Sequence, residues 1–289
     1  MERELASQMC SNRVSKIGFF TIATNRYVLM LEAQLGSISD QVKELGWRYV
    51  VATDQVEHLA RFTKDNQLDD HVKILKCPPL KFPLASMLRF KYISQEMGEF
   101  DFLCYLDCDM EIENPHALHV AIQKSTSVHL VRHPGWARDF GIKLKPKERL
   151  AEIYCRLRKG GLGSWESRRN SSAWVPRQKR RDYYAGGIFF GPTEEIRKLS
   201  KICDAWMDAD LRAGIVASVH DESYLNRWAT LNRFTPLGPE FCYSHFPWLP
   251  DLDVVVRALN KNSMRLPLNE IEAELKPLSF TFQLKDLPS

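Results

Sequence analysis

Short, nearly unbroken apolar runs alternate with helix-like stretches through the first part of the chain. Four runs have the length and the aromatic and β-branched content of strands, namely 16–24, 47–54, 71–76 and 100–107. Between them, 27–38 and 84–100 have helix-compatible patterns. Strands buried on both faces and separated by helices are typical of a mainly parallel sheet with helices on both sides. The fold class predicted is therefore α/β, with ligands expected at the carboxyl ends of the strands.

The second half is less regular. Two further strands are predicted at 127–134 and 186–192, a helix over 193–214 with Gly214 as its C-cap, and another helix starting near His220. The stretch 156–181 contains three glycines and few apolar positions. Its length and charge indicate either a lid over an anionic ligand or a solvated loop. Its nine basic residues are Arg156, Arg158, Lys159, Arg168, Arg169, Arg177, Lys179, Arg180 and Arg181.

Composition excludes several classes of protein. With 289 residues, 44% of them hydrophobic and 26% charged, the chain is neither disordered nor collagen-like, and it is long enough for one or two domains. A net charge of +4 is too small to argue for nucleic acid. The seven cysteines form no C-x-x-C pair, which favours a reducing compartment. Because the polar leader 1–15 has no apolar core and no run could cross a bilayer, we expect a soluble, cytoplasmic protein without a membrane span.

A D-x-D string, Asp107-Cys108-Asp109, ends the last of the first four predicted strands. In extended backbone, residues i and i+2 point the same way, so both carboxylates can converge on one hard cation. Mg²⁺ or Mn²⁺ with a diphosphate fits this arrangement. The alternative is an acidic turn or a helix cap, since such strings also occur by chance.

Two other strings contain candidate site residues. In HDESYLNRW, Asp221 and Glu222 either cap a helix, or Glu222 stabilises a developing oxocarbenium ion while Asp221 binds sugar hydroxyls. In YYAGGIFFG, Gly186 and Gly187 either relieve packing or let a ligand approach the backbone. Neither string decides between its two readings.

The ordered set of strings resembles glycosyltransferase family 6, which includes the histo-blood-group A and B transferases and the α1,3-galactosyltransferases. The resemblance covers roughly Lys16 to Arg265, and the combination is more specific than any single string. It implies one GT-A catalytic domain over 16–289, with a Rossmann-like, mainly parallel sheet, a basic lid loop at 156–181 and a C-terminal tail at 261–289. The strings are Ile22-Ala23-Thr24 with Tyr27, VVATDQ, SMLRF, DFLCYLDCDMEI, RHPGW, WESRRNSSAWVP, DYYAGGIFFG, HDESYLNRW and PEF.

The resemblance also implies a role for each matching residue. Asp107 and Asp109 match the metal ligands, and Glu222 with Asp221 matches the catalytic carboxylate pair. Positions matching the donor and nucleotide site are Ile22, Ala23, Thr24, Tyr27, Arg89, Asp107, Cys108, Asp109, Ala185, Gly186, Gly187, Lys261 and Arg265. Positions matching the acceptor side are His133, Ser164, Glu166 and His220.

Several positions depart from the family pattern. Ile22 replaces an aromatic residue, while Ser244 and Val219 replace an acidic residue and a tryptophan on the acceptor side. Gly187 favours N-acetylgalactosamine, because in mammalian members glycine at this place leaves room for the acetamido group. The D-x-D aspartates are retained, whereas many bacterial members have N-x-N. The missing membrane anchor differs from the Golgi members and fits a soluble bacterial or viral type.

The expected function is thus a retaining α1,3-glycosyl transfer. The resemblance implies that N-acetylgalactosamine (GalNAc) or galactose (Gal) moves from a UDP-sugar to an oligosaccharide or glycoside acceptor, with Mn²⁺ or Mg²⁺ at the D-x-D aspartates. A UDP-sugar hydrolase is one alternative, and a glycan- or nucleotide-binding protein without transfer is another. Nucleic-acid binding by the basic stretch is disfavoured, because it would leave the carboxylates without a purpose.

Overall fold

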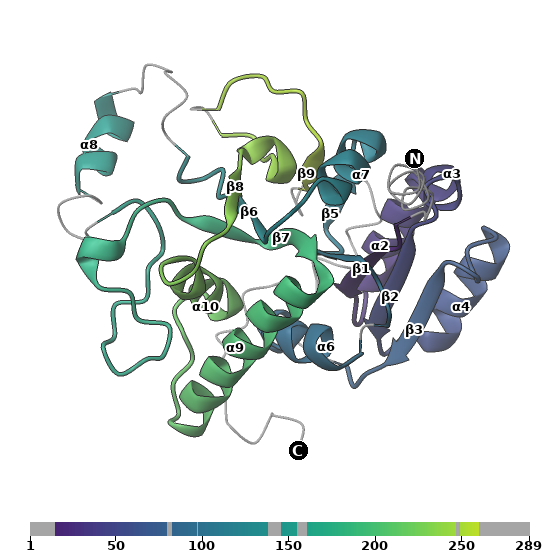
Figure 1. The fold of residues 1–289 in the computed structure, drawn as a ribbon, viewed down its shortest axis with the longest axis horizontal. Coiled ribbons are helices and arrows are strands. Elements are labelled where there is room, and N and C mark those ends of the chain that lie inside the picture. The colour runs from purple at the N-terminus through teal and green to yellow at the C-terminus, as the bar shows by residue number, and fades with distance from the viewer. Residues whose placement is uncertain are drawn as a thin grey trace, which may run out of the picture.

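A seven-stranded sheet forms the centre of the computed structural model, which describes residues 15–79, 83–96, 98–137, 146–154, 161–246 and 249–259 (Figure 1). Strands β3, β2, β1 and β4 pair in parallel, β7 is antiparallel to both of its neighbours, and β6 pairs in parallel with β8. The predicted mainly parallel sheet is therefore confirmed, with β7 reversed. The strands are β1 Ile17–Ile22, β2 Arg48–Thr53, β3 Val72–Lys76, β4 Phe102–Leu106, β6 His129–Arg132, β7 Tyr184–Pro192 and β8 Thr235–Leu237.

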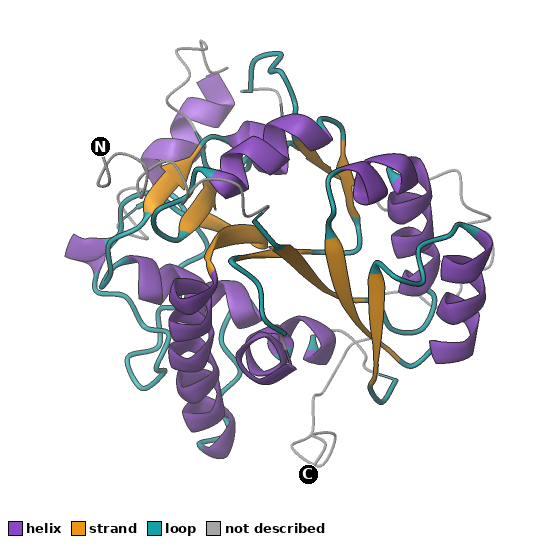
Figure 2. Cartoon of the chain, turned by 45° about the vertical axis from the view of Figure 1, so that its right-hand side comes forward, coloured by secondary structure: helices purple, strands orange, loops and turns teal. Residues whose placement is uncertain are grey.

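Helices cover both faces of this sheet (Figure 2). Because side chains alternate along a strand, neighbouring Phe19 and Phe20 belong to different core clusters. The Phe19 cluster includes apolar residues of α2 Tyr27–Ser37, α3 Ser39–Glu44, α4 Val56–Asp65 and α7 Pro115–Gln123. The Phe20 cluster includes those of α5 Leu84–Met87, α6 Arg89–Glu96, α9 Thr193–Arg212 and α10 His220–Ala229.

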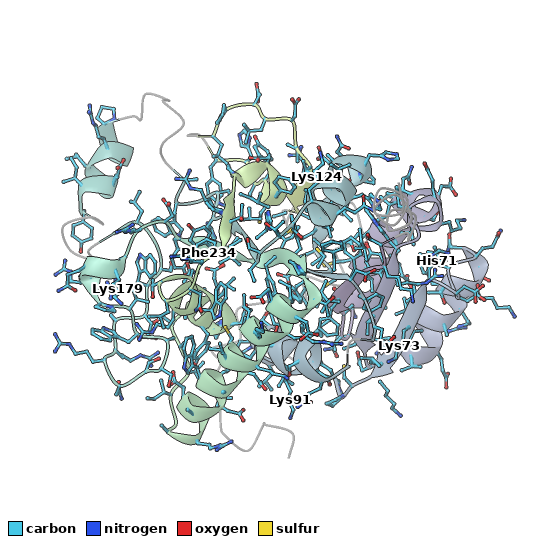
Figure 3. All side chains as sticks on the ribbon, viewed as in Figure 1. His71, Lys73, Lys91, Lys124, Lys179 and Phe234 are labelled. Carbon is cyan, nitrogen blue, oxygen red and sulfur yellow. The ribbon has the colours of Figure 1, made fainter. Side chains whose placement is uncertain are left out.

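Smaller elements complete the described structure. Strands β5 Met110–Ile112 and β9 Val256–Ala258 form an antiparallel pair beside the main sheet. The remaining elements are the helix α8 Pro146–Tyr154 and the short 3-10 helices Arg177–Lys179 and Pro239–Cys242. Figure 3 shows Phe234 towards the middle of the molecule, where its ring meets that of Tyr184 edge-on, whereas Lys73, Lys91 and Lys179 lie towards the periphery.

Most predicted elements are found close to their expected bounds, and two differ in detail. The helix predicted over 84–100 is divided into α5 and α6, because the chain turns at Leu88 and places Arg89 at the start of α6. Strand β7 begins at Tyr184, two residues before its predicted start, because Tyr184 pairs with Arg132 of β6. The side chain of Asn226 of α10 also bonds the Tyr184 backbone.

The turn after α9 confirms the predicted C-cap. Gly214 has a φ of +71°, its N–H donates to Leu211, and the N–H of Ile215 donates to the Asp210 carbonyl. This glycine reverses the chain so that α10 begins a few residues later. His220, the first residue of α10, has a φ of +42°, which is uncommon for a residue with a side chain.

Some predictions lie outside the described residues. These are the leader up to residue 14, the first residues of the basic stretch at 156–160, and the tail with Lys261 and Arg265. The helices in the described part of the chain are all too short or too polar to cross a membrane. The five cysteines in that part are free and buried.

Candidate active site

Arg89 lies at the centre of a polar cluster at the carboxyl edge of the sheet. Its side chain is only 3% exposed, and its guanidinium lies 3.2 Å from Asp107 Oδ1 and 3.2 Å from Asp221 Oδ2. It also donates to the carbonyls of Ser86 and Gly186. Arg89 therefore joins the end of β4, the start of β7 and the first turn of α10.

The D-x-D string forms a turn rather than a continuation of the strand. Strand β4 ends at Leu106, and the N–H of Met110 donates to the Asp107 carbonyl at 3.2 Å. Both aspartates remain partly exposed, whereas Cys108 between them is buried in the core. The expectation of extended backbone was wrong here. A four-residue turn, not the pleat of a strand, determines the directions of the two carboxylates.

Two side chains that the sequence analysis missed hold this turn. Gln34 of α2 donates to the carbonyls of Asp107, at 3.4 Å, and Met110, at 2.5 Å. The Tyr105 hydroxyl donates to Asp107 Oδ1, and the Tyr105 ring lies 4.2 Å from the Arg89 guanidinium carbon. Tyr105 precedes Asp107 by two residues, so strand alternation could have placed both on one face. No local signal marks Gln34, whose contact spans 73 residues.

The carboxylates of Asp221 and Glu222 contact elements other than their own helix α10. The N-cap residue is Val219, which has no side-chain cap, and Asp221 pairs with Arg89 instead. Glu222 accepts a hydrogen bond of 2.9 Å from the N–H of Gly186. Both carboxylates lie in the first turn of α10, where the helix favours negative charge, and both also make these contacts with other elements.

Tyr183 connects Glu222 to the acceptor-side residues, and the sequence analysis did not single it out. Its hydroxyl donates to the carbonyl oxygen of Ser164 at 3.4 Å and lies near enough to Glu222 to lower the pKa of that carboxyl. Its ring packs at 6.0 Å from the His133 ring and edge-on to Trp165 at 5.1 Å. The predicted residues His133, Ser164 and Glu222 thus all contact one buried tyrosine.

The two glycines of β7 allow side chains to approach its backbone closely. A Cβ on Gly186 would lie 3.0 Å from Asp221 Oδ2. A Cβ on Gly187 would overlap the Met110 methyl and lie 3.1 Å from Asp107 Oδ2. Packing within the site is therefore sufficient reason for both glycines. The presence of glycine at position 187 can thus be explained without a larger donor sugar.

The residues predicted to contact the nucleotide lie around the end of β1. Ile22, Ala23 and Thr24 are buried, and Tyr27 begins α2 directly after them. Strand β1 pairs in parallel with β4, so its end lies beside the start of the D-x-D turn. Ala185, predicted to line the donor site, is also buried, next to Gly186 in β7.

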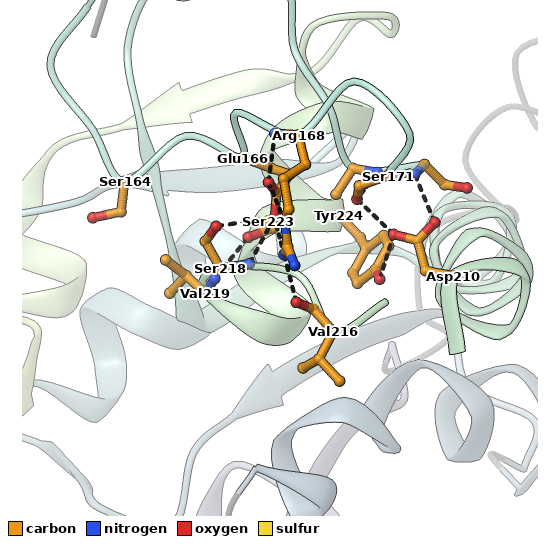
Figure 4. Close-up of polar contacts among 12 residues, drawn as sticks. Ser164, Glu166, Arg168, Ser171, Asp210, Val216, Ser218, Val219, Ser223 and Tyr224 are labelled. Carbon is orange, nitrogen blue, oxygen red and sulfur yellow. Dashed lines mark hydrogen bonds and ion pairs between the residues drawn. The ribbon is translucent and has the colours of Figure 1, made fainter. Parts of the chain in front are cut away.

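Glu166, predicted on the acceptor side, lies in an internal network (Figure 4). Its side chain is 1% exposed and accepts hydrogen bonds from the backbone and guanidinium of Arg168 and from the N–H and hydroxyl of Ser218. Arg168 also donates to the Val216 carbonyl. These contacts tie the loop after Ser164 to the segment that leads into α10.

A second buried carboxylate strengthens the same connection. Asp210 of α9 accepts from the Ser171 hydroxyl at 2.5 Å, the Ser172 N–H at 2.6 Å and the Tyr224 hydroxyl at 3.0 Å (Figure 4). The loop that begins at the acceptor-side Ser164 is thus joined to α9 and α10. His220, also predicted on the acceptor side, stands at the start of α10 between Ser218 and the two carboxylates.

Crowding of acidic groups shifts their protonation. Burial raises the pKa of Asp107 and of Asp221 to about 6, although Arg89 lowers both. Burial likewise raises the pKa of Glu222 to about 7, although the Gly186 N–H and the Tyr183 hydroxyl lower it. Burial alone would lower the pKa of Arg89, but the carboxylates around it raise the value overall. Asp107, Asp221 and Glu222 therefore act on one guanidinium, and their ionised forms carry more negative charge than Arg89 can balance.

This charge balance fits a divalent cation at the D-x-D turn. Asp109 raises the pKa of Asp107, so the two carboxylates are close enough to repel each other, and a cation between them would relieve that repulsion. Within the described residues, no group of three or more His, Cys, Asp or Glu side chains forms a complete metal site. Mg²⁺ and Mn²⁺ accept such partial sites, because phosphate oxygens and water supply the other ligands.

Comparison with known proteins agrees with this arrangement. The sequence model that describes glycosyltransferase family 6 matches residues 151–266 of this chain. The O-antigen biosynthesis glycosyltransferase WbnI of Escherichia coli is 25% identical over 224 residues, which are 75% of this chain and 83% of WbnI. The histo-blood group ABO system transferase 1 of Rattus norvegicus is 31% identical over 165 residues, which are 55% of this chain and 41% of the rat protein.

A third relative has a donor sugar in its name. The globoside alpha-1,3-N-acetylgalactosaminyltransferase 1 of Homo sapiens is 27% identical over 178 residues, which are 59% of this chain and 45% of the human protein. The matched part of the chain therefore corresponds to less than half the length of the rat and human relatives. The family match over residues 151–266 and these relatives, together with the sheet and the carboxylate cluster, support membership of the chain in glycosyltransferase family 6 and a glycosyl-transfer activity.

Proposed function

We propose that the chain is a retaining α1,3-glycosyltransferase that moves GalNAc or Gal from a UDP-sugar to a glycan acceptor. The observation that carries the proposal is the fixed position of the Glu222 carboxylate. The Gly186 N–H donates to it at 2.9 Å, beside an arginine that bridges the D-x-D turn to Asp221. A sugar held at the edge of β7 would have its anomeric carbon near this carboxylate.

Glu222 supplies the negative charge that the reaction needs. When the bond between the anomeric carbon and the UDP oxygen breaks, its electron pair leaves with UDP and the sugar becomes cation-like. An ionised Glu222 stabilises that cation, or bonds to it covalently, until the oxygen of the acceptor hydroxyl bonds to the anomeric carbon and the hydroxyl proton passes to UDP. In both routes the acceptor bonds to the face of the sugar that UDP leaves, so the configuration at the anomeric carbon is retained. In both routes the Glu222 carboxylate lies on the opposite face of the sugar.

Asp107 and Asp109 would hold Mn²⁺ or Mg²⁺ against the donor diphosphate. A bound divalent ion supplies Lewis-acid stabilisation of the charge that develops on the departing UDP. Arg89 keeps Asp107 in place through its 3.2 Å contact, so its first role is to position a ligand. Lys261 and Arg265, matched through the family resemblance, would add positive charge near the diphosphate.

His133, Ser164 and His220 would face the acceptor. His133 and Ser164 contact opposite parts of Tyr183, and His220 directly precedes the carboxylate pair. Burial lowers the pKa of His133 to about 4, so its ring is neutral near pH 7 and can accept or donate a hydrogen bond. The acceptor hydroxyl would then approach the sugar from the side on which His133 and Tyr183 lie.

A donor panel tests the proposal. Purified protein is incubated with UDP-GalNAc, UDP-Gal, UDP-N-acetylglucosamine and UDP-glucose, with Mn²⁺ and a panel of glycan acceptors, and both UDP and the sugar product are measured. A new α-linked glycoside from UDP-GalNAc or UDP-Gal is expected. Free sugar without a glycoside would instead identify a hydrolase. Binding of UDP-sugar without any UDP release would identify a binding protein and overturn the enzyme proposal.

The metal assignment has its own test. Asp109→Asn keeps the size of the side chain but removes a charged ligand. We expect Mn²⁺ to raise the melting temperature of the wild-type protein in the presence of UDP and to leave that of the variant unchanged. Asp182→Asn, a more exposed carboxylate paired with Arg132, is the matched control and keeps the wild-type response. Full activity of the wild-type protein in EDTA would refute the assignment.

A further inference from the structure

The helix α8 exposes an unusual amount of apolar surface. Leu150 is 66% exposed, Tyr154 57% and Ile153 47%. Among the described residues, the other exposed large apolar side chains are Val120, Ile202 and Leu231, which are 37–46% exposed and lie singly on other parts of the chain. Single exposed apolar residues are normal, but a cluster on one nine-residue helix marks an interaction surface.

The three side chains lie on one face of α8, with basic residues along its borders. At about 100° per residue, positions 150, 153 and 154 point in similar directions. Lys147 then lies beside Tyr154, and Arg149 lies beside Ile153, and both basic residues are exposed. Glu152 lies on the far side of the helix. We call Lys147, Arg149, Leu150, Ile153 and Tyr154 the α8 face.

The α8 face is placed where a large flat partner could reach it. Figure 1 shows α8 at the margin of the molecule, far from the central sheet. Within the described part of the chain, α8 makes at most marginal contact with other helices and strands. The sequence on both sides of α8 is also basic, with Lys143 and Lys145 before it and Arg156, Arg158 and Lys159 after it.

We propose that the α8 face docks onto a lipid bilayer that contains anionic phospholipids. An apolar stripe bordered by Lys and Arg is the pattern by which short amphipathic helices lie in the membrane interface. The apolar side chains enter the boundary of the acyl chains while the basic residues meet lipid phosphates. A second copy of the chain fits less well, because pairing two such faces would bring Lys147 and Arg149 of both copies together.

The position of α8 in the chain indicates a class of acceptor. This helix is inserted between His133 and Ser164, the two residues that meet at Tyr183 in the site. Docking through α8 would hold the acceptor side of the enzyme near the bilayer. The acceptor would then be a glycan attached to a lipid. This statement about the acceptor rests on the proposed function, whereas the docking of α8 on a bilayer is independent of it.

Vesicle co-sedimentation of the full chain tests the docking. Vesicles of phosphatidylcholine alone are compared with vesicles of phosphatidylcholine and phosphatidylglycerol, at low and at high salt. We expect binding to the anionic vesicles that weakens as salt rises. Leu150→Glu combined with Ile153→Glu should weaken it by at least about tenfold, because the apolar contact is lost. Lys147→Glu combined with Arg149→Glu should weaken binding to anionic vesicles by a similar factor.

Two controls keep the result interpretable. Leu231→Glu changes an exposed apolar residue away from α8 and should bind vesicles as the wild type does. Leu150→Ser combined with Ile153→Ser removes apolar surface without adding charge and should also weaken binding. Wild-type protein that binds no vesicles, or α8 variants that bind like wild type, would overturn the proposal. A dimer of the wild-type protein that these variants abolish would identify a second copy as the partner instead.

The same variants separate docking from catalysis. With a short, water-soluble acceptor, the α8 variants should keep the wild-type rate of UDP release, since α8 contributes no residue to the carboxylate cluster. With a lipid-linked acceptor in anionic vesicles, their rate should fall at least about tenfold. An equal rate on both acceptors would refute the lipid-linked acceptor class. If no variant or wild type releases UDP at all, the proposed function fails while vesicle binding still tests the docking.

Discussion

Individual side chains of the site are held by contacts that cross long distances in the sequence. Arg89 joins carboxylates on β4 and α10, and Tyr183 joins Glu222 to His133 and Ser164. Each of these two residues is buried and satisfied by polar partners, which makes its position well defined. A group held this way needs little rearrangement when charge develops on a bound sugar.

Removal of the Tyr183 hydroxyl should shift the pH dependence of activity. Glu222 has a pKa of about 7 and must be ionised to stabilise a cation, so kcat/KM should rise as pH rises through about 7. The Tyr183 hydroxyl lowers that pKa, so Tyr183→Phe should move the rising limb to higher pH by about one unit. Tyr184→Phe, the adjacent buried tyrosine, should leave the limb in place. An unchanged limb in Tyr183→Phe would contradict the assigned effect of this hydroxyl on Glu222.

At the scale of elements, the loop after Ser164 and the segment before α10 behave as one unit. Glu166 binds Arg168 and Ser218, and Asp210 binds the same loop and Tyr224 of α10 (Figure 4). The turn before α10 includes His220 at a φ of +42°, a conformation that the surrounding contacts must hold. We therefore expect Glu166 to position Asp221 and Glu222, the proposed catalytic carboxylates, indirectly through Ser218 and the start of α10.

Glu166→Gln should lower stability in a pH-dependent way. Burial raises the pKa of Glu166, but the Arg168 and Ser218 donors outweigh it and lower the pKa to about 2, from 4.5. A carboxyl with a depressed folded pKa stabilises the protein above its unfolded pKa and loses that contribution as pH falls through the folded value. The variant should thus be about 3 kcal/mol less stable at pH 7, and the difference should shrink below pH 4.5.

Urea unfolding at several pH values measures this difference. Glu194→Gln is the control, since Glu194 is exposed and its pair with Arg197 contributes little. If Glu166 positions the carboxylates, Glu166→Gln should also lower kcat more than it raises KM for the donor, at temperatures where the variant is folded. A variant that loses stability but keeps kcat would show that Glu166 is structural alone.

At the scale of the whole molecule, the two core clusters determine where the site can be. Phe189 of β7 is fully buried, stacks on Tyr105 at 5.1 Å and packs near Phe90 of α6 at 6.0 Å. The hydroxyl of the same Tyr105 donates a hydrogen bond to Asp107. Through Tyr105, the apolar core at this edge of the sheet is therefore in direct contact with the carboxylate cluster.

Phe189→Ala should destabilise the entire described fold. Truncating a buried phenylalanine costs about 3–5 kcal/mol, because apolar surface is lost and a cavity remains. Leu231→Ala, at a position that is 46% exposed, should change the free energy of unfolding by less than about 0.5 kcal/mol. Chemical denaturation followed by fluorescence measures both. A loss of under 1 kcal/mol in Phe189→Ala would mean that the packing around β7 collapses without a cavity.

Much of the fold could be read from local patterns. The apolar runs predicted β1, β2 and β4, because a strand buried on both faces requires a nearly continuous apolar sequence. The edge strand β3 was also predicted, although only part of it is buried. Gly214 marked the end of α9, since a residue at positive φ after a helix is most often glycine. The small sheet of β5 and β9 was not predicted, because each strand has three residues and its partner is distant in the chain.

By itself the sequence predicted the fold class, the resemblance to the family and the candidate carboxylates Asp107, Asp109, Asp221 and Glu222, because these depend on residue types and their order along the chain. Only the tertiary structure decided which groups hold those carboxylates. It turned the D-x-D string out of the strand, paired Asp221 with Arg89, and placed Gln34, Tyr105 and Tyr183 in the site. Burial and hydrogen bonding between distant segments set these contacts, and neither leaves a periodic signal in the sequence.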